Sequence, residues 1–388
     1  MIENFEMYNP TRLIFGENRI EELPAYLPEG KKILMVYGQG SIKKNGVYDR
    51  VTQGLSGQKY IEFGGIEPNP TYETLMNAVK LGRDEHIDFI LAVGGGSVID
   101  GAKFIAAAIP FDQGDPWLIL SEQAEVKESI PLGTVLTLPA TGSEMNRGAV
   151  ISRKSSKEKF AFLTEKSFPV FSILDISVLQ SLPKRQIANG IVDAYVHVLE
   201  QYITYPVNAK LQDRFAESIL KTLIEEGPRF YHDKNNKEAG ANLMFCATMA
   251  LNGIISAGVP TDWSIHLVGH ELTAMYGIDH ARTLAVILPA LYMVKLDDKL
   301  EKLAQYAQNV WGINHGDAKE KAIAAIEKTD DFFRSLNIPT KLSKYNIDLN
   351  DTINAIHDRF KKRGILQFGE NGIISIDELE KILITAWV

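Results

Sequence analysis

The sequence predicts a two-domain protein, in which an α/β domain with a doubly wound parallel sheet is followed by an all-helical domain. Two observations support this prediction. The chain has 388 residues, which is more than a single hydrophobic core usually organises. Short apolar runs alternate with helical stretches up to Asp175, and helical periodicity continues from there to the C-terminus. We therefore expect one domain over residues 1–180 and a second over residues 181–388.

The first half contains continuous apolar runs that end in glycine-rich turns. Runs without polar alternation indicate strands buried on both faces of a sheet, with the intervening helices as crossovers. The expected strands are Lys32–Tyr37, Tyr60–Phe63, Asp88–Val93, Gly133–Leu138 and Val170–Leu174, and the clearest helices are Thr71–Asp84 and Val98–Ala108.

The second half begins with a helix-start signal at Ser181-Leu182-Pro183, where proline suits the first turn. Gly258–Pro260 and Leu336–Pro339 separate later helices. Few strand-like runs follow Asp175, so this half is expected to be helical.

Composition and charge exclude several classes of function. The formal charge of −8 disfavours nucleic acid and anionic lipid as main partners. No apolar run is long enough to span a membrane, and the first residues do not resemble a secretory signal. Cys246 is the single cysteine, which excludes an internal disulfide and a zinc site made of cysteines. We expect a cytoplasmic protein.

A glycine-rich turn after one expected strand indicates a phosphate site. The apolar run Phe89–Val93 leads into Gly94-Gly95-Gly96-Ser97, and a helical pattern follows at once. Glycines allow a ligand to approach the backbone, and the N–H groups of a helix start favour an anion. Ile99 stands where the third glycine of the usual dinucleotide fingerprint would be. The alternative is a tight turn whose glycines serve packing alone.

Two further turns follow neighbouring strands, so one extended nucleotide would explain all three. They are Gly38-Gln39-Gly40-Ser41, and Pro139-Ala140-Thr141-Gly142-Ser143-Glu144. The first half is thus predicted to be a Rossmann-like dinucleotide-binding domain. The first turn lacks a carboxylate and is followed by Lys43 and Lys44, which favours NADP over NAD. Alternatively, both lysines are solvated surface residues.

Histidines in the second half have the spacing of a metal site. Asp193 and His197 are four residues apart in a helical stretch, as are His266 and His270, and His280 follows in a loop-like segment. Residues four apart share one helix face, and a carboxylate with three imidazoles suits Fe(II), Zn(II) or Mn(II). Five candidates for four positions leave one histidine to move a proton. The remaining histidines, His86, His232, His315 and His357, are expected at the surface.

Together these motifs resemble the iron-containing (group III) alcohol dehydrogenase family over essentially the whole chain. The segments that carry the resemblance are Asn9–Gly16, Gly94–Asp100, Pro139–Glu144, the Asp193/His197 pair and the His266/His270/His280 set. Within the family, the Gly38–Ser41 turn with Lys43 and Lys44 looks closest to the bacterial NADPH-dependent aldehyde reductases, also called butanol dehydrogenases.

The resemblance implies a dehydroquinate synthase-like fold, with a catalytic cleft between a dinucleotide domain and a helical metal domain. It implies a homodimer in which the strand near Arg12–Phe15 contributes to the interface. It assigns Fe²⁺ or Zn²⁺ to Asp193, His197, His266 and His280, and it places His270 beside the nicotinamide. The cofactor residues that it implies are Gly95, Gly96, Ser97, Asp100, Thr137, Leu138, Thr141, Asn146 and Lys159, and the first turn adds Gly38, Gly40 and Ser41.

The implied reaction moves hydride between NADP(H) and a small aliphatic aldehyde or primary alcohol, with the cation polarising the substrate oxygen. The apolar stretch Met249–Ala257, expected to be helical and near the site, favours uncharged substrates. The rivals are a glycerol dehydrogenase-like enzyme, a dehydroquinate synthase-like lyase, and a nucleotide- or metal-binding sensor without turnover.

Overall fold

The computed structural model describes residues 1–388, and the chain forms two compact units. The α/β unit consists of Tyr8–Pro183 and Asp233–Asn252. The helical unit consists of Met1–Met7, Lys184–His232 and Gly253–Val388. Each unit therefore takes segments from both sides of residue 180. Every helix is either too short or too polar to serve as a membrane span.

The α/β unit is built on a six-stranded sheet whose strands pair in parallel in the order β1-β8-β5-β4-β2-β3. The sheet strands are β1 (Arg12–Gly16), β2 (Lys32–Gly38), β3 (Lys59–Ile66), β4 (Phe89–Gly94), β5 (Leu132–Leu136) and β8 (Phe171–Asp175). All residues of β4, β5 and β8 are buried, which confirms that the continuous apolar runs form strands covered on both faces.

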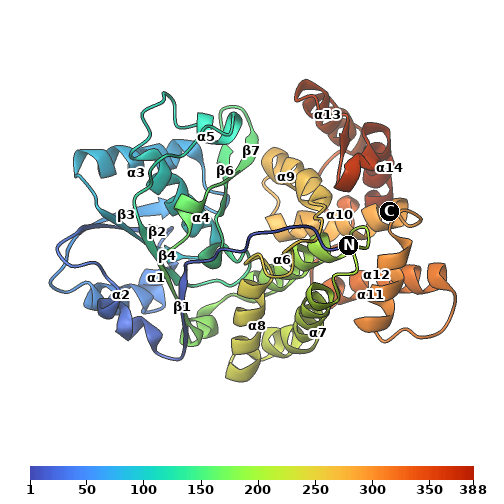
Figure 1. Ribbon diagram of the computed structural model, residues 1–388, viewed down its shortest axis with the longest axis horizontal. Coiled ribbons are helices and arrows are strands. Elements are labelled where there is room, and N and C mark those ends of the chain that lie inside the picture. Colours follow the sequence, from blue (N-terminus) through green and yellow to red (C-terminus); the bar gives the residue numbers. More distant parts are fainter. The chain divides into compact units, whose positions relative to one another are not determined.

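Helices cover both faces of this sheet. In Figure 1, α3 (Tyr72–Asp84) and α4 (Gly96–Ala108) lie on one side, and α1 (Ser41–Lys44) and α2 (Val47–Gly54) lie on the other. The remaining elements are α5 (Leu118–Ser121), α8 (Lys237–Met249), the hairpin of β6 (Gly148–Arg153) and β7 (Glu158–Leu163), and the 3-10 turns η1 (Arg19–Ala25), η2 (Ser143–Met145), η3 (Glu165–Ser167) and η4 (Ile176–Ser181). The predicted α/β fold class is confirmed.

The helical unit surrounds α6 (Lys184–Tyr202), in which every residue from Ile187 to the last is buried. The other helices are α7 (Lys210–His232), α9 (Ser264–Tyr276), α10 (His280–Val294), α11 (Leu300–Asn309), α12 (Ala318–Ser335), α13 (Leu349–Lys362) and α14 (Ile376–Trp387). Short pieces complete it: η5 (Leu342–Lys344), η6 (Glu370–Gly372), and the two-residue strands β9 (Gln367–Phe368) and β10 (Ile374–Ser375). Because α6 packs on both α7 and α10, its polar residues lie inside the unit.

Candidate functional site

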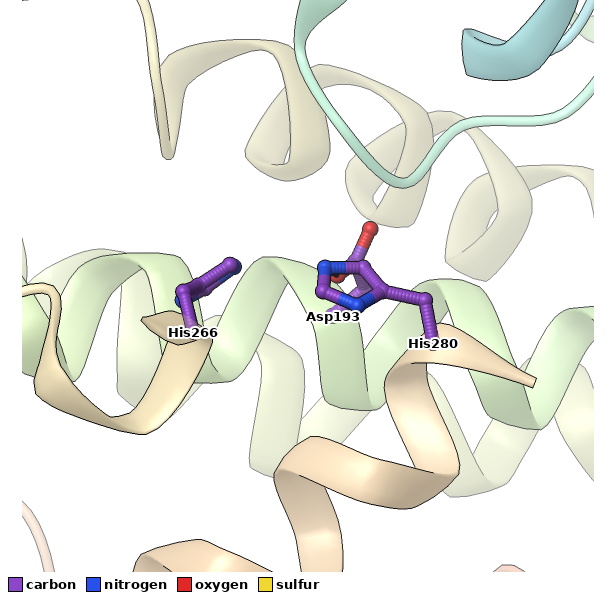
Figure 2. Close-up of side chains that lie close together, drawn as sticks. All are labelled: Asp193, His266 and His280. Carbon is purple, nitrogen blue, oxygen red and sulfur yellow. Dashed lines mark ion pairs between the residues drawn. The ribbon is translucent and has the colours of Figure 1, made fainter. Parts of the chain in front are cut away.

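Three of the predicted metal ligands lie together inside the helical unit. Asp193 is on α6, His266 is on α9 and His280 is the first residue of α10. One ligand atom from each lies within 4.8 Å of the other two. Figure 2 shows the two imidazoles approaching Asp193 from the two different helices. The sequence predicts a loop at His280, whereas the structure shows that this residue begins α10.

The chemistry of this donor set fits a divalent cation. Asp193 is only 3% exposed, and its Oδ1 atom accepts no hydrogen bond. That oxygen lies 3.8 Å from Nε2 of His280. A buried carboxylate is stable only when paired, and imidazole nitrogens beside it can share one positive ion with it.

The other two histidines lie beside this group. The ring of His197 is stacked on that of His266, with centroids 4.7 Å apart. The ring centroid of His270 lies 4.9 Å from that of His280 and 5.9 Å from that of His266. His197 thus lies next to His266, and His270 lies next to His280.

A buried carboxylate behind His266 was missed from the sequence. Glu200 is 1% exposed, and its Oε2 atom forms a hydrogen bond with Nδ1 of His266. Its position was a usable signal, because a residue three after His197 and seven after Asp193 lies on the same face of α6.

His280 is held by an anchor immediately before it in the chain. Oδ2 of Asp279 accepts hydrogen bonds of 2.8 Å from both Arg185 and Asn189, near the start of α6. Burial alone would raise the pKa of Asp279, but these two donors lower it below its usual value. The charged side chain therefore fixes the first turn of α10 against α6.

In the α/β unit, the glycine turn and the loop after β5 pack against each other. A β-carbon at Gly95 would lie 2.9 Å from Cβ of Leu138, and one at Gly96 would lie 2.4 Å from Oγ1 of Thr141. Both glycines therefore have a packing reason, as the alternative interpretation foresaw. Gly95 precedes α4 without a side-chain cap, which leaves helix N–H groups for an anion. The backbone N–H of Thr137 donates a hydrogen bond to the carbonyl oxygen of Gly94.

Asn69 joins two of the predicted cofactor residues and was also missed. Its backbone N–H donates to Oγ of Ser97 at 3.3 Å, and its Oδ1 accepts from Nζ of Lys159 at 3.0 Å. Its φ of 55° is left-handed, which is uncommon outside glycine and is frequent at functional sites. Sequence reasoning could have noted it only as an Asn-Pro turn.

Asp100 and Asn146 both form hydrogen bonds to other residues of the α/β unit. Asp100 accepts from Oγ of Ser143 at 2.6 Å and from the N–H of Val150 at 3.0 Å. Lys103, fully buried, donates to the carbonyl and to Oδ1 of Asn146, at 2.9 and 3.0 Å. Burial lowers the pKa of Lys103 to about 8. These contacts hold the loop after β5 on α4, so both residues shape the turn.

The third turn follows β2, which neighbours β4 in the sheet. Gly38 ends β2, Gly40 has a φ of 98°, and Ser41 begins α1. A β-carbon at Gly38 would lie 3.6 Å from Val98 of α4, so this turn lies close to the glycine turn.

Lys43 lies in an aromatic cage at this turn. Its Nζ atom is 5.0 Å from the ring centroid of Tyr37 and 4.7 Å from that of Tyr48. Both tyrosine hydroxyls donate to Glu62, at 3.1 and 2.7 Å. The hydrogen bond to Glu62 raises the pKa of Tyr48 to about 12. The cage holds the exposed ammonium in place.

Two further expectations concern residues outside these groups. Met249–Ala257 is not a helix: α8 ends at Met249, and the segment is divided between the two units. Within it, Gly253 adopts a φ of 95°, a conformation that a continuous helix does not contain. His86, His232 and His315 are exposed, as predicted, whereas His357 is half-buried.

Comparison with known proteins identifies the family. Residues 10–176 match the model of the iron-containing alcohol dehydrogenases, and residues 187–384 match that of the family's C-terminal domain. The chain is 53% identical to the NADPH-dependent aldehyde reductase YqhD of Escherichia coli over 98% of this chain and 99% of that protein. It is 40% identical to probable NADH-dependent butanol dehydrogenase 1 of Bacillus subtilis over the same shares of the two chains.

Solved structures of relatives have the same fold as this chain. The crystal structure of E. coli YqhD superposes with a TM-score of 0.97 at 52% identity, covering 99% of each chain. The NADH-dependent butanol dehydrogenase A of Thermotoga maritima gives 0.95 at 32% identity, covering 100% of this chain and 99% of that one. The chain therefore belongs to the iron-containing alcohol dehydrogenase family.

Proposed function

We propose that this protein is a metal-dependent alcohol dehydrogenase that uses NADP(H) to reduce small aliphatic aldehydes to primary alcohols, and to catalyse the reverse reaction. The observation that carries the proposal is the close donor set of Asp193, His266 and His280, in a chain whose other unit has a glycine turn without a side-chain cap at the start of α4. The names of the relatives, an aldehyde reductase and butanol dehydrogenases, support the substrate class.

Asp193, His197, His266 and His280 are the proposed ligands of one divalent cation. When bound, such a cation supplies Lewis-acid polarisation of a carbonyl oxygen. The family name favours iron, and two or more imidazoles with a carboxylate also accept zinc. Metal analysis of protein purified without added ions would identify the native ion.

His270 is the proposed proton carrier. It lies one helical turn from His266 on α9 and is only partly buried, so its imidazole can exchange a proton with solvent. An imidazole titrates near neutral pH, which suits donation to the oxygen of the aldehyde as hydride arrives at its carbon.

The β2 turn supports a preference for NADP(H). A ribose 2′-phosphate needs a cation, and Lys43 is an exposed ammonium held by Tyr37 and Tyr48. The carboxylate beside it, Glu62, accepts hydrogen bonds from both tyrosines. Glu62 thus accepts hydrogen bonds from two hydroxyl groups, and the ammonium of Lys43 is the charged group that can pair with the phosphate.

We also propose a homodimer that pairs through β1. This strand is at one end of the sheet order, so its outer backbone groups are open to pairing. Phe15 on β1 is 37% exposed and contacts Phe245, which is 45% exposed, with ring centroids 5.7 Å apart. Sedimentation velocity should show a dimer, and Phe15→Lys should shift it toward monomer. A monomeric parent protein would contradict the pairing.

A reducing compartment is the proposed location, because the chain has a single cysteine, Cys246, and so forms no internal disulfide. The cytoplasm is such a compartment.

The direct test of the activity is the absorbance of NADPH during incubation with butanal. We expect oxidation of NADPH that stops after chelation and returns when the divalent cation is restored. A protein that binds both NADPH and the cation, yet oxidises no NADPH with any short aldehyde, would instead be a sensor.

A further inference from the structure

We propose that Glu200 is a positioning residue: its carboxylate both caps α9 and fixes which nitrogen of His266 is available as a ligand. This inference rests on the proposed function, since it concerns the ligand set of the proposed cation. Glu200 is not one of the proposed ligands, and it acts through His266 from the opposite side of the ring.

The residue at the N-cap position of α9 does not cap this helix. Trp263, the residue before the helix, has a left-handed φ of 67° and provides no side-chain cap. Oε1 of Glu200 instead accepts from the backbone N–H groups of Ile265 and His266, at 2.6 and 3.4 Å. The first N–H groups of a helix need such an acceptor, and a negative one also suits the helix dipole.

The other oxygen of the Glu200 carboxylate contacts the imidazole ring of His266. Oε2 is hydrogen-bonded to Nδ1 of His266. A neutral imidazole carries one hydrogen, and a carboxylate oxygen can only accept. The hydrogen is therefore on Nδ1, and the lone pair of Nε2 is left for the side of the ring that faces Asp193 and His280.

The two roles are linked through one rigid element. Asp193, His197 and Glu200 lie on one face of α6, so the same helix supplies two proposed ligands and the residue that orients a third. The backbone carbonyl of Glu200 also accepts from the N–H of Asp262, at 2.9 Å. The chain leading into α9 is thus tied to α6 by both the backbone and the side chain of Glu200.

A buried lysine holds the same segment from its other side. Lys299 donates to Asp262 and to Glu370, both at 2.6 Å. Asp262 in turn accepts from the N–H of Ser264, the first residue of α9, at 2.9 Å. Lys299 therefore forms ion pairs with Asp262 and Glu370, whereas the side-chain partner of Glu200 is the imidazole of His266.

Glu200→Gln separates the two roles because it is isosteric. Its carbonyl oxygen can still accept from Ile265 and His266, so the cap remains. The amide N–H₂ group then lies opposite Nδ1 of His266 and must donate to it, which moves the ring hydrogen to Nε2. Glu200→Ala loses the cap as well, so it should also destabilise the fold.

Two measurements test the inference. Nitrogen-15 NMR of histidine-labelled, metal-free protein should show His266 protonated at Nδ1 in the parent and at Nε2 in Glu200→Gln. The affinity for Co²⁺, measured by chelator competition, should fall by about 10- to 100-fold in this variant, as for other lost partners of metal-ligating histidines. Thermal unfolding without metal should change little, because the cap is kept.

Glu217→Gln is the matched control. Glu217 is also buried in the helical unit, and it accepts from the hydroxyl of Tyr202 at 2.7 Å rather than from an imidazole. Its replacement should leave the Co²⁺ affinity and the His266 tautomer unchanged.

Two results would overturn the inference alone: parent-like Co²⁺ affinity in Glu200→Gln, or a hydrogen on Nε2 of His266 in the parent. A parent protein that binds no divalent cation would overturn the proposed function together with this role of Glu200. The two failures are therefore distinguishable without measuring turnover.

Discussion

His266 and His270 are one turn apart on α9, yet their removal should have different consequences. His270→Ala should lower turnover by about 100-fold, the low end for loss of a general acid or base, with metal content unchanged. His266→Ala should instead release the cation, because it removes a ligand from the close group. Metal analysis beside steady-state kinetics would check both. Equal metal loss in the two variants would contradict the assignment of separate roles.

The lysine in the aromatic cage should decide between the two nicotinamide cofactors. Lys43→Met removes the ammonium held between Tyr37 and Tyr48, and we expect the KM for NADPH to rise by about tenfold, as for one lost charge-assisted hydrogen bond. The KM for NADH should not change. Lys44→Met is the control, because Lys44 is exposed and is the next residue on α1. Parallel loss with both cofactors would show that the cage serves structure alone.

Helical spacing in the sequence identified the candidate ligands that lie four residues apart. It missed residues whose role depends on the side chains or backbone groups that they contact. Asp193, His197, His266 and His270 stood out because residues four apart share a helix face. Glu200 has the same register, but a glutamate on a helix is usually solvated, so nothing marked it as buried. Asn69 contacts Ser97 and Lys159 from a left-handed backbone conformation, which the sequence did not disclose.

Among whole elements, five of the six strands of the main sheet were predictable from apolar runs, and the hairpin outside this sheet was not. β2, β3, β4, β5 and β8 all coincide with apolar runs identified in the sequence. β1 was not among the strands predicted from apolar runs, and only the family resemblance implied a strand near Arg12–Phe15. Ile14 is the one buried residue of its five, so such a short edge strand gives a weak apolar signal. The β6–β7 hairpin was missed for a similar reason: its strands are half exposed, and they pair with each other rather than with the main sheet.

Asp175 connects several elements where β8 ends, so its charge should matter for stability. It is fully buried, accepts from the N–H groups of Ile20 and Ser177, at 3.1 and 3.0 Å, and pairs with Arg50 at 2.5 Å. Asp175→Asn should lower the free energy of unfolding by about 3 kcal/mol at pH 7, as when one partner of a buried ion pair is removed. Urea titration would measure it.

The pKa of Asp175 determines how this difference in the free energy of unfolding changes with pH. Burial would raise the pKa of Asp175, but the hydrogen bonds from Ser177 and Ile20 and the charge of Arg50 lower it below its usual value. A lowered pKa stabilises the fold at any pH above the pKa of the unfolded chain, about 3.9, and this contribution is lost as the pH falls through the folded value. The difference between parent and Asp175→Asn should therefore shrink in acid. A constant difference down to pH 3 would contradict the assigned charge.

On the scale of the whole molecule, each unit holds one half of the proposed chemistry. All proposed metal ligands are in the helical unit, and all proposed cofactor residues are in the α/β unit. The pattern of apolar residues indicated an α/β half and a helical half. It could not indicate that Met1–Met7 join the helical unit or that Asp233–Asn252 join the α/β unit. Such assignments depend on long-range packing, for example the hydrogen bond from Thr248 to Glu144, rather than on local pattern.

This separation predicts that the two ligands stabilise different parts of the chain. A ligand at 100 times its Kd adds about 2.7 kcal/mol to the unit that binds it, equivalent to about 5 to 10 °C in Tm. Chelation should lower the Tm of the helical unit, and NADPH should raise that of the α/β unit. Trp117 lies in the α/β unit and the other three tryptophans lie in the helical unit, so fluorescence of Trp117→Phe reports on the helical unit alone. In that variant, melting should respond to chelation more strongly than to NADPH; an equal response to both would mean that the units unfold as one cooperative block.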